Sequence, residues 1–265
     1  MPNPNEAMPK KLLPIIYVID SSGSMEADGN MTQVNEAIQD TMDILKEKAA
    51  ENADAEILIG ALKFATGAEW VFDGLLSTDD FYWNDIQAGG MTYLGDALEK
   101  LNAKMSRSEF FADKIGYKCP VLIFMSDGYP NDPGDSWRKS LEKIRQNKWF
   151  ANSIKIAIAV GGDADRDVLI EVVDNNPEGL ITITDTAKLK DLIVAVSLTA
   201  SKIGSVSRPQ DAGNAGSEIA KIAVQGDDGL GAEVNPDNIV ADPVVPDSGT
   251  SDGFDNGGFD DGGWD

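Results

Sequence analysis

The chain contains no histidine and only one cysteine among its 265 residues. Because histidine is the usual general base and the commonest transition-metal ligand, its absence excludes a Ser-His-Asp triad and histidine-based metal sites. The single cysteine, Cys119, cannot form an intrachain disulfide, and its place beside an apolar run is typical of a small core residue. Any site chemistry must therefore come from other side chains.

Long apolar segments are also missing. No stretch approaches the roughly 20 apolar residues that a transmembrane helix needs. Residues 1–11 contain no apolar segment of signal-peptide length. We therefore expect a soluble, cytoplasmic protein that has no membrane partner.

Basic residues are scarce relative to acidic ones, and the formal net charge is −23. Residues 205–265 contain thirteen acidic and two basic side chains, and the preceding part of the chain is acidic too. Such a charge argues against nucleic acid and anionic membranes as partners. It favours cations and basic protein surfaces.

What the chain does contain is a group of oxygen donors directly after the apolar run 15–19. Asp20, Ser22 and Ser24 place one carboxylate and two hydroxyls at intervals of two residues. Hard oxygen donors suit a small divalent cation such as Mg²⁺, which also keeps several water ligands. The segment therefore predicts part of a metal site.

Two later segments could complete this site. Thr92 follows Gly-Gly-Met at the start of a helical pattern, and Asp127 comes shortly after the apolar run 121–125. Each segment alone has a simpler interpretation, because Asp, Ser and Thr at such positions are common helix caps and turn residues. In an open parallel sheet, however, the carboxyl ends of the strands share one edge, where ligands bind. The combination favours one shared site.

Further aspartates follow these loops. Asp132 and Asp135 come shortly after Asp127, and Asp165 precedes another helical pattern. Asp132 and Asp135 could enrich cations near the site. For all three, capping of helices and turns is the favoured interpretation.

Short apolar runs alternate with helical patterns along the chain. The runs that predict strands are 15–19, 57–64, 121–125, 154–160 and 180–184. Their continuous apolar character is typical of strands covered on both faces. Apolar residues recur at helical spacing in 34–49, 94–105 and 189–203. The alternation predicts an α/β fold: a doubly wound, mostly parallel central sheet flanked by helices.

The composition divides the chain into three parts. We expect an N-terminal extension at residues 1–10, one folded domain at residues 11–205, and an acidic, Gly/Asp-rich tail at residues 206–265 that is largely disordered. Gly204 is expected at the C′ position that ends the last helix of the domain. Within the tail, residues 217–223 could form a short helix.

The end of the tail contains a small repeat. Phe254, Phe259 and Trp264 each follow a glycine and precede an aspartate. Exposed aromatic side chains work against solubility, so they favour a docking segment, and aromatics beside aspartates suit a basic groove with apolar pockets. A purely solubilising acidic tail is the alternative.

The loop motifs together resemble the metal-ion-dependent adhesion site of the von Willebrand factor type A domain. The resemblance covers roughly residues 10–205 and rests on five residues in the expected order: Asp20, Ser22, Ser24, Thr92 and Asp127. Within that family, the segments 89–98, 126–132 and 159–165 are similar to the bacterial TerY-like branch, which is associated with tellurium-resistance and stress gene clusters.

The resemblance implies a metal-dependent protein-binding module. Mg²⁺ or Mn²⁺ would be bound by the five residues, and an acidic side chain of a protein partner would complete the coordination. TerY-like proteins are typically encoded beside a kinase and a phosphatase, which suggests stress or tellurium-resistance signalling. The alternative is the substrate- or adaptor-recognition subunit of an AAA+ ATPase of the MoxR or chelatase type. An enzyme is not expected, because the chain offers no phosphate-binding loop and no general base beyond the metal ligands.

Overall fold

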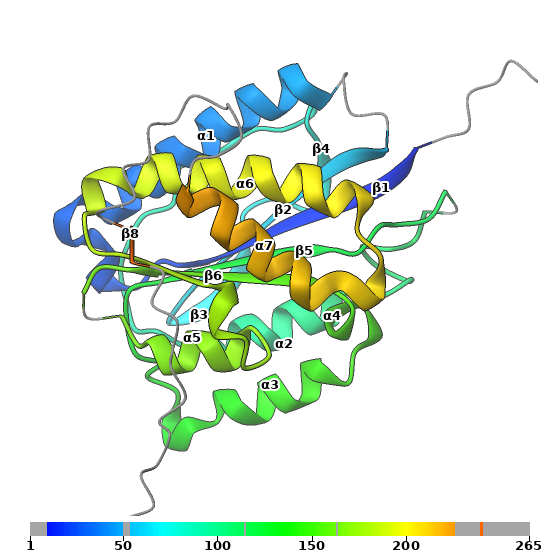
Figure 1. Cartoon of the computed structure of the whole chain (residues 1–265). Helices are drawn as coiled ribbons and strands as arrows, with labels where there is room; N and C mark the ends of the chain where they lie inside the picture. The colour runs from blue at the N-terminus through cyan, green and yellow to red at the C-terminus, as the bar shows by residue number, and fades with distance from the viewer. Residues whose placement is uncertain (1–9, 50–53, 114, 163, 226–238, 241–265) are drawn as a thin grey trace, which may run out of the picture.

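The structure, a computed structural model, describes residues 10–49, 54–113, 115–162, 164–225 and 239–240 (Figure 1). Its centre is a single sheet of the strands β1 (Lys11–Asp20), β2 (Ala55–Ala65), β3 (Gly67–Trp70), β4 (Leu76–Ser77), β5 (Val121–Ser126), β6 (Ile154–Val160), β7 (Leu180–Ile183) and β8 (Ile239–Val240). Their order in the sheet is β3-β2-β1-β5-β6-β7-β8, and β4 pairs with β2. The pairs from β2 through β7 are parallel, whereas β3, β4 and β8 are antiparallel to their neighbours. The doubly wound, mostly parallel sheet predicted from the sequence is confirmed.

Burial on both faces explains why the central strands are so apolar. In β1, Ile15, Tyr17 and Ile19 face one core cluster, whereas Ile16 and Val18 face the other. This alternation is the two-residue period of a strand, and helices must cover both faces.

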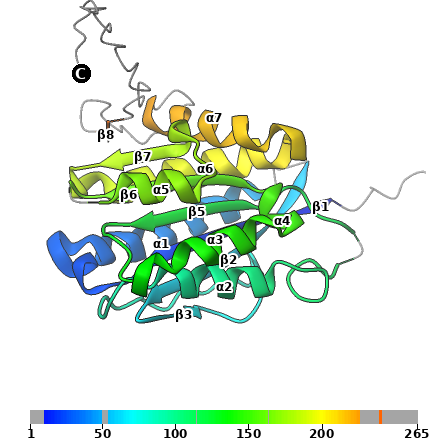
Figure 2. The ribbon, with the colours of Figure 1, turned by 90° about the horizontal axis from the view of Figure 1, so that it is seen from below.

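Helices do cover both faces, as Figures 1 and 2 show. One face carries α1 (Asn30–Ala49), α6 (Leu189–Val206) and α7 (Ala212–Gln225); the other carries α2 (Leu94–Lys104), α3 (Trp137–Arg145), α4 (Lys148–Ala151) and α5 (Arg166–Val172). Short 3-10 helices are η1 (Gly23–Gly29), η2 (Pro133–Asp135), η3 (Pro177–Gly179), η4 (Thr186–Lys188) and η5 (Pro209–Asp211). Among the described residues, no helix combines the length and the apolar character needed to cross a membrane.

The sheet changes its winding direction beside β1. This strand lies between β2 and β5, so the chain winds outward in opposite directions from the β1/β5 pair. Open α/β sheets bind ligands at the carboxyl ends of the strands that flank such a switch point. The ends of β1 and β5 are Asp20 and Ser126, so the topology places the predicted oxygen donors at this position.

Gly204 does not end its helix as predicted. Helix α6 continues to Val206, and its C-cap is Ser207. The helix approaches the sheet closely here, because a Cβ atom on Gly204 would lie 3.0 Å from a methyl group of Val121 and 3.1 Å from one of Leu13. The glycine serves packing of the helix on the sheet rather than helix termination.

The packed domain extends beyond its predicted end at residue 205. Helix α7 buries Ala215, Ile219 and Ala220 in the same core cluster as α1 and α6. Gly216 lets this helix approach β6, because a Cβ atom there would lie 2.6 Å from the carbonyl oxygen of Lys155. The predicted short helix therefore exists, is longer than expected and belongs to the core.

Most of the predicted N-terminal extension, and the tail after α7 apart from β8, lie outside the described residues. Residues 1–9, 226–238 and 241–265 are not described. Strand β8 pairs with the end of β7, where Val240 lies opposite Thr182. The chain therefore passes the edge of the sheet once more before its last 25 residues.

We expect Gly216→Ala to destabilise the domain by about 1–3 kcal/mol, because the added methyl group overpacks against backbone. Gly213→Ala in the same helix is the matched control. Apart from the neighbouring residues and backbone of its own helix, no atom of the described residues lies within 4 Å of its Cβ position, so that change should be neutral or slightly stabilising. Urea unfolding of both full-length variants measures the difference. Equal midpoints would show that α7 does not pack on the sheet.

Candidate metal centre

Asp20, the last residue of β1, is fully buried. Its Oδ1 accepts a hydrogen bond from the backbone N–H of Ser22 at 2.8 Å, and its Oδ2 accepts one from the hydroxyl of Ser126 at 2.6 Å. The first bond shapes the loop that follows β1, and the second links that loop to the end of β5. Both oxygens of the carboxylate are thereby oriented.

The hydroxyls of the first loop form a chain toward the third loop. Ser22 Oγ and Ser24 Oγ lie 3.0 Å apart, and Ser24 Oγ donates to Asp127 Oδ1 at 2.8 Å. Ser22 is buried, Ser24 is exposed and Asp127 is half-buried. The oxygen donors thus run from the interior of the sheet edge to the surface, where a ligand from outside can reach them.

Backbone contacts bring the second loop against the first. Gly23 N–H donates to the carbonyl oxygen of Gly90 at 3.1 Å, and Gly89 N–H donates to that of Ser21 at 2.8 Å. Gly90 has a φ of +88°, and a Cβ atom there would lie 2.6 Å from Thr66 Oγ1. Only glycine fits both the backbone conformation and the space.

Thr92 is held in place by the third loop. Its N–H donates to Asn131 Oδ1 at 3.0 Å, and its carbonyl oxygen accepts from the N–H of Asn131 at 2.7 Å. A Cβ atom on Gly128 would lie 3.7 Å from Ser24 Oγ and 4.0 Å from Thr92 Oγ1. The structure therefore brings all five predicted residues together. Asn131 was missed as a positioning residue, although it lies within the motif at 126–132.

The two carboxylates of the site resist ionisation. The pKa of Asp20 is raised to about 6, mainly by burial and to a smaller extent by the charge of Asp127. The hydrogen bonds from Ser126 and Ser22 act in the opposite direction and lower it. Burial also raises the pKa of Asp127, against the hydrogen bond from Ser24. A bound cation would offset both the burial of these charges and their mutual repulsion.

The donor set fits a hard divalent cation. All five predicted side chains offer oxygen, and two of them are carboxylates that together match a charge of +2. Within the described part of the chain, no three acidic or cysteine side chains gather into a conventional metal cluster. Hydroxyl groups would therefore have to supply part of the coordination, and a cation held in this way would keep positions open to other ligands.

Two of the other aspartates, Asp132 and Asp165, cap helices. Asp132 accepts hydrogen bonds from the N–H groups of Leu94 and Gly95, both at 2.9 Å, so it caps α2 from a distant loop. Asp165 caps α5, as predicted, through the N–H of Val168 at 3.0 Å.

Asp135 does not cap α3. The residue before that helix is Ser136, whose side chain makes no capping hydrogen bond. Asp135 instead accepts hydrogen bonds from Arg138 at 2.9 Å and from Tyr129 at 3.2 Å. The predicted cap was wrong because Arg138, a charged partner in the first turn of the helix, competes for this carboxylate.

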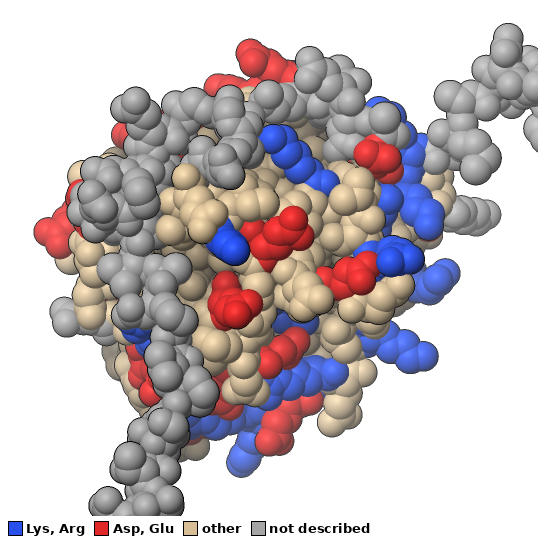
Figure 3. All heavy atoms as spheres, in the orientation of Figure 1, with Lys and Arg blue, Asp and Glu red and all other residues tan. Residues whose placement is uncertain are grey.

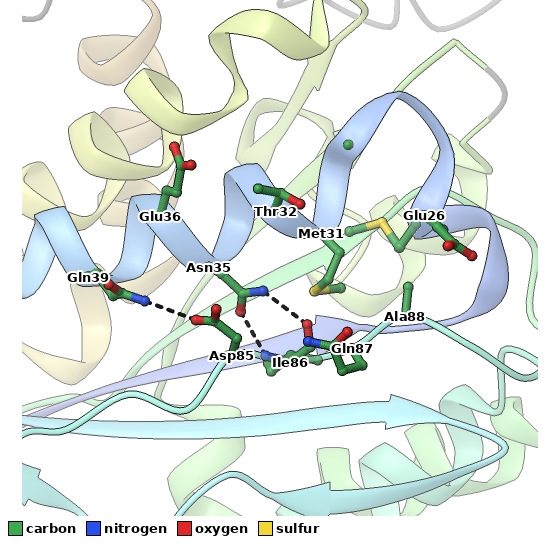
Figure 4. A pocket seen from close by; sticks show the side chains of 12 residues that line it. Glu26, Met31, Thr32, Asn35, Glu36, Gln39, Asp85, Ile86, Gln87 and Ala88 are labelled. Atoms are coloured by element: carbon green, nitrogen blue, oxygen red, sulfur yellow. Dashed lines mark hydrogen bonds between the residues drawn. The ribbon is translucent and has the colours of Figure 1, made fainter.

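A polar groove of about 410 Å³ begins at Met25, beside the first loop, and runs along α1 (Figure 4). Its floor is fixed by Asn35, which bonds both the N–H and the carbonyl oxygen of Ile86 at 2.9 Å. Carboxylates line it, and they are contributed by Glu26, Glu36 and Asp85. On the other two loops, two large apolar side chains are about half exposed: Met91 at 47% and Tyr129 at 50%. The oxygen donors are therefore flanked by apolar surface and by an acidic groove.

Comparison with known proteins supports the fold. The family model of the von Willebrand factor type A domain matches residues 15–194. The chain is similar to a von Willebrand factor type A structure from Catenulispora acidiphila, at 16% identity and a TM-score of 0.53, over 72% of this chain and 43% of that chain. It is also similar to the ArnB paralog VWA2 from Sulfolobus acidocaldarius, at 20% identity and a TM-score of 0.50, over 69% and 44% of the two chains.

A third similar structure is proximal thread matrix protein 1 from the mussel byssus, whose metal-ion-dependent adhesion site (MIDAS) motif is occupied by zinc. It shares 20% identity at a TM-score of 0.50, over 71% of this chain and 46% of that chain. At these identities the likeness is one of fold. The chain spans less than half the length of each of the three structures. A search among curated proteins found no match.

We expect Asp132→Ala to lower the free energy of unfolding by about 0.5–2 kcal/mol, because two N–H groups at the start of α2 lose their acceptor. Asp96→Ala is the matched control. Asp96 lies in the first turn of the same helix and is exposed, so its loss should cost less. Thermal unfolding compares the two. A smaller effect of Asp132→Ala than of Asp96→Ala would contradict the capping role.

Proposed function

The chain belongs to the von Willebrand factor type A domain family, and we propose that it is a protein-binding module that docks partners through a divalent cation. The observation that carries this proposal is the convergence of three oxygen-bearing loops at the switch point of the sheet. Asp20, Ser22, Ser24, Thr92 and Asp127 would hold the cation.

The roles of the five residues differ with their burial. Asp20 and Ser22 are buried at the edge of the sheet and would bind the cation from the protein interior. Ser24 and Asp127 lie closer to the surface. When bound, the cation supplies a positive centre that attracts a carboxylate from outside. The hydrogen bonds of Ser126 and Asn131 hold Asp20 and Thr92 in place, so little ordering is needed when the partner arrives.

The surroundings of the site indicate the chemistry of the partner. A docking surface there would meet exposed Met91 and Tyr129 on one side and the carboxylates of the groove on another. A partner that offers an acidic side chain, flanked by apolar contacts and a basic residue that reaches Glu26 or Asp85, would complement all three features.

We propose Mg²⁺ or Mn²⁺ as the resident cation, because hydroxyl and carboxylate oxygens are the ligands these ions prefer. The zinc in the adhesion motif of the mussel protein supports the more general proposal that this kind of site holds a divalent cation. Binding rather than catalysis is proposed because the chain contains no histidine to act as a general base. A place in a TerY-like stress system, beside a kinase and a phosphatase, is a finer proposal that rests on the sequence motifs.

Calorimetric titration of the full chain with Mg²⁺, Mn²⁺ and Zn²⁺ tests the site. We expect saturable binding that Asp20→Asn and Asp127→Asn each abolish, because each removes a charge that the cation needs. Asp135→Asn is the matched control, since this exposed aspartate pairs with Arg138 and asparagine tolerates its φ of +53°. A cation at a hundred times its Kd should also stabilise the native state by about 2.7 kcal/mol.

Binding that survives in both variants would place the cations elsewhere on this acidic chain and overturn the proposed site. Loss of binding only in the two site variants supports it. The docking role is tested by partner capture in Mg²⁺ and in EDTA. We expect partners that depend on Mg²⁺ and that Asp127→Asn loses, whereas Asp135→Asn should retain them.

A further inference from the structure

A second concave surface lies at the opposite end of the sheet from the oxygen donors. It is a cavity of about 420 Å³ whose lining includes Arg107, Tyr117, Lys118, Lys148 and Trp149. Lys118 comes shortly before β5, whereas Asp127 follows that strand. The six residues of β5 span about 20 Å, so this cavity is a separate site.

One wall of the cavity is made of ordered aromatic rings. Trp149 stacks on buried Phe111 with ring centroids 4.1 Å apart, and Tyr117 packs edge-on against Trp149 at 6.0 Å. The backbone of Trp149 is held as well, because its N–H donates to Asn147 Oδ1 at 2.9 Å. Trp149 is only partly buried. A flat, fixed ring face is therefore available to an incoming aromatic side chain.

The rim of the cavity is basic on a strongly acidic protein. Arg107, Lys118 and Lys148 have no ion-pair partner in the described part of the chain, whereas Lys104, Lys143 and Lys155 are paired. In Figure 3, basic side chains gather toward the right-hand and lower edges of the face. The right-hand edge is the end where α4 and the turn between α6 and α7 lie in Figure 1.

Two acidic residues lie near the cavity, and both are already engaged. The N–H of Asp113 donates to Tyr117 Oη at 3.2 Å, and its Oδ1 accepts a hydrogen bond from the N–H of Ile115 at 2.7 Å. Asp211 lies close enough to Cys119, a lining residue, for its charge to contribute to raising the pKa of that thiol. The Oδ2 of Asp211 accepts a hydrogen bond from Arg208 at 3.2 Å. It is therefore not available to all three cations of the rim. The combination of unpaired cations and an aromatic wall calls for a ligand that is both acidic and aromatic.

We propose that this cavity binds the C-terminal repeat of the same chain, residues 253–265. That segment has the complementary chemistry, because each of its three aromatic side chains is followed by an aspartate. A Phe or Trp would pack on Trp149, and the adjacent carboxylates would pair with the rim cations. Glycines before each aromatic let the backbone approach the surface closely.

The length of the chain allows this contact within one molecule. Val240 lies beside β7, near the carboxyl end of the sheet. The 14 residues from there to Phe254 can span about 45 Å when extended, which is more than the length of the strands between the two ends of the sheet. Because a tethered segment has an effective concentration of the order of millimolar, modest affinity is enough to keep it bound.

A photo-reactive benzoylphenylalanine in place of Phe259 in the full-length chain tests the proposal. Irradiation should cross-link this position, within one molecule, to peptides that contain Tyr117 or Trp149, as mapped by mass spectrometry. Arg107→Glu with Lys148→Glu should lower the yield by about tenfold, because two attractions become repulsions. Lys100→Glu with Lys139→Glu is the matched control, since these lysines are equally exposed and lie outside the cavity. The control should leave the yield unchanged.

A second measurement does not depend on the cross-linker. The triple variant Phe254→Ala, Phe259→Ala, Trp264→Ala should increase hydrogen exchange at residues 117–120 and 148–152, and leave residues 20–25 unaffected. Cross-links to the metal end, cross-links between copies, or equal yields in the two charge-reversed variants would overturn the proposal. The proposal is independent of cation binding, because the cavity and the metal centre lie at opposite ends of the sheet.

Discussion

The buried carboxylate of Asp20 is the constraint on which the rest of the metal centre depends. A charge at the end of a central strand, with no exposed surface, costs free energy unless its oxygens are satisfied. Ser22 and Ser126 supply hydrogen bonds to both oxygens, and in doing so they tie the loop after β1 to the end of β5. The remaining oxygen donors continue outward from this bond network through Ser24 to Asp127.

Close approach of backbones is the second requirement. The loop that carries Thr92 reaches the first loop because Gly90 adopts a positive φ and approaches Thr66 more closely than any side chain would allow. Asn131 then forms hydrogen bonds with both the N–H and the carbonyl oxygen of Thr92. The same short segment, 126–132, therefore contributes a candidate ligand, a positioning side chain and the cap of α2.

The sequence was a good guide wherever one local pattern decided the outcome. Continuous apolar runs identified the five parallel strands, and the spacing of oxygen donors identified five residues that the fold brings together. Prediction failed where a distant element decided. Gly204 comes at the end of a helical pattern, where glycine commonly terminates a helix. In the structure it is instead a packing residue, because the sheet beneath it leaves no space for a side chain. The sequence around Asp132 predicts a local turn or cap, yet this residue caps a helix that begins 38 residues earlier.

Hydrophobic periodicity thus determined the fold class, and motif spacing determined which edge of the sheet carries the oxygen donors. Composition alone excluded histidine chemistry. All three are properties that can be read from the chain without knowing its tertiary contacts. Tertiary structure alone decided that α7, rich in alanine and glycine, belongs to the core, since the close contact between Gly216 and the carbonyl oxygen of Lys155 involves a distant strand. It alone decided that Trp149, Tyr117 and three unpaired cations meet around one cavity. These residues are scattered over about 40 positions, and no local pattern relates them before the sheet and helices have packed.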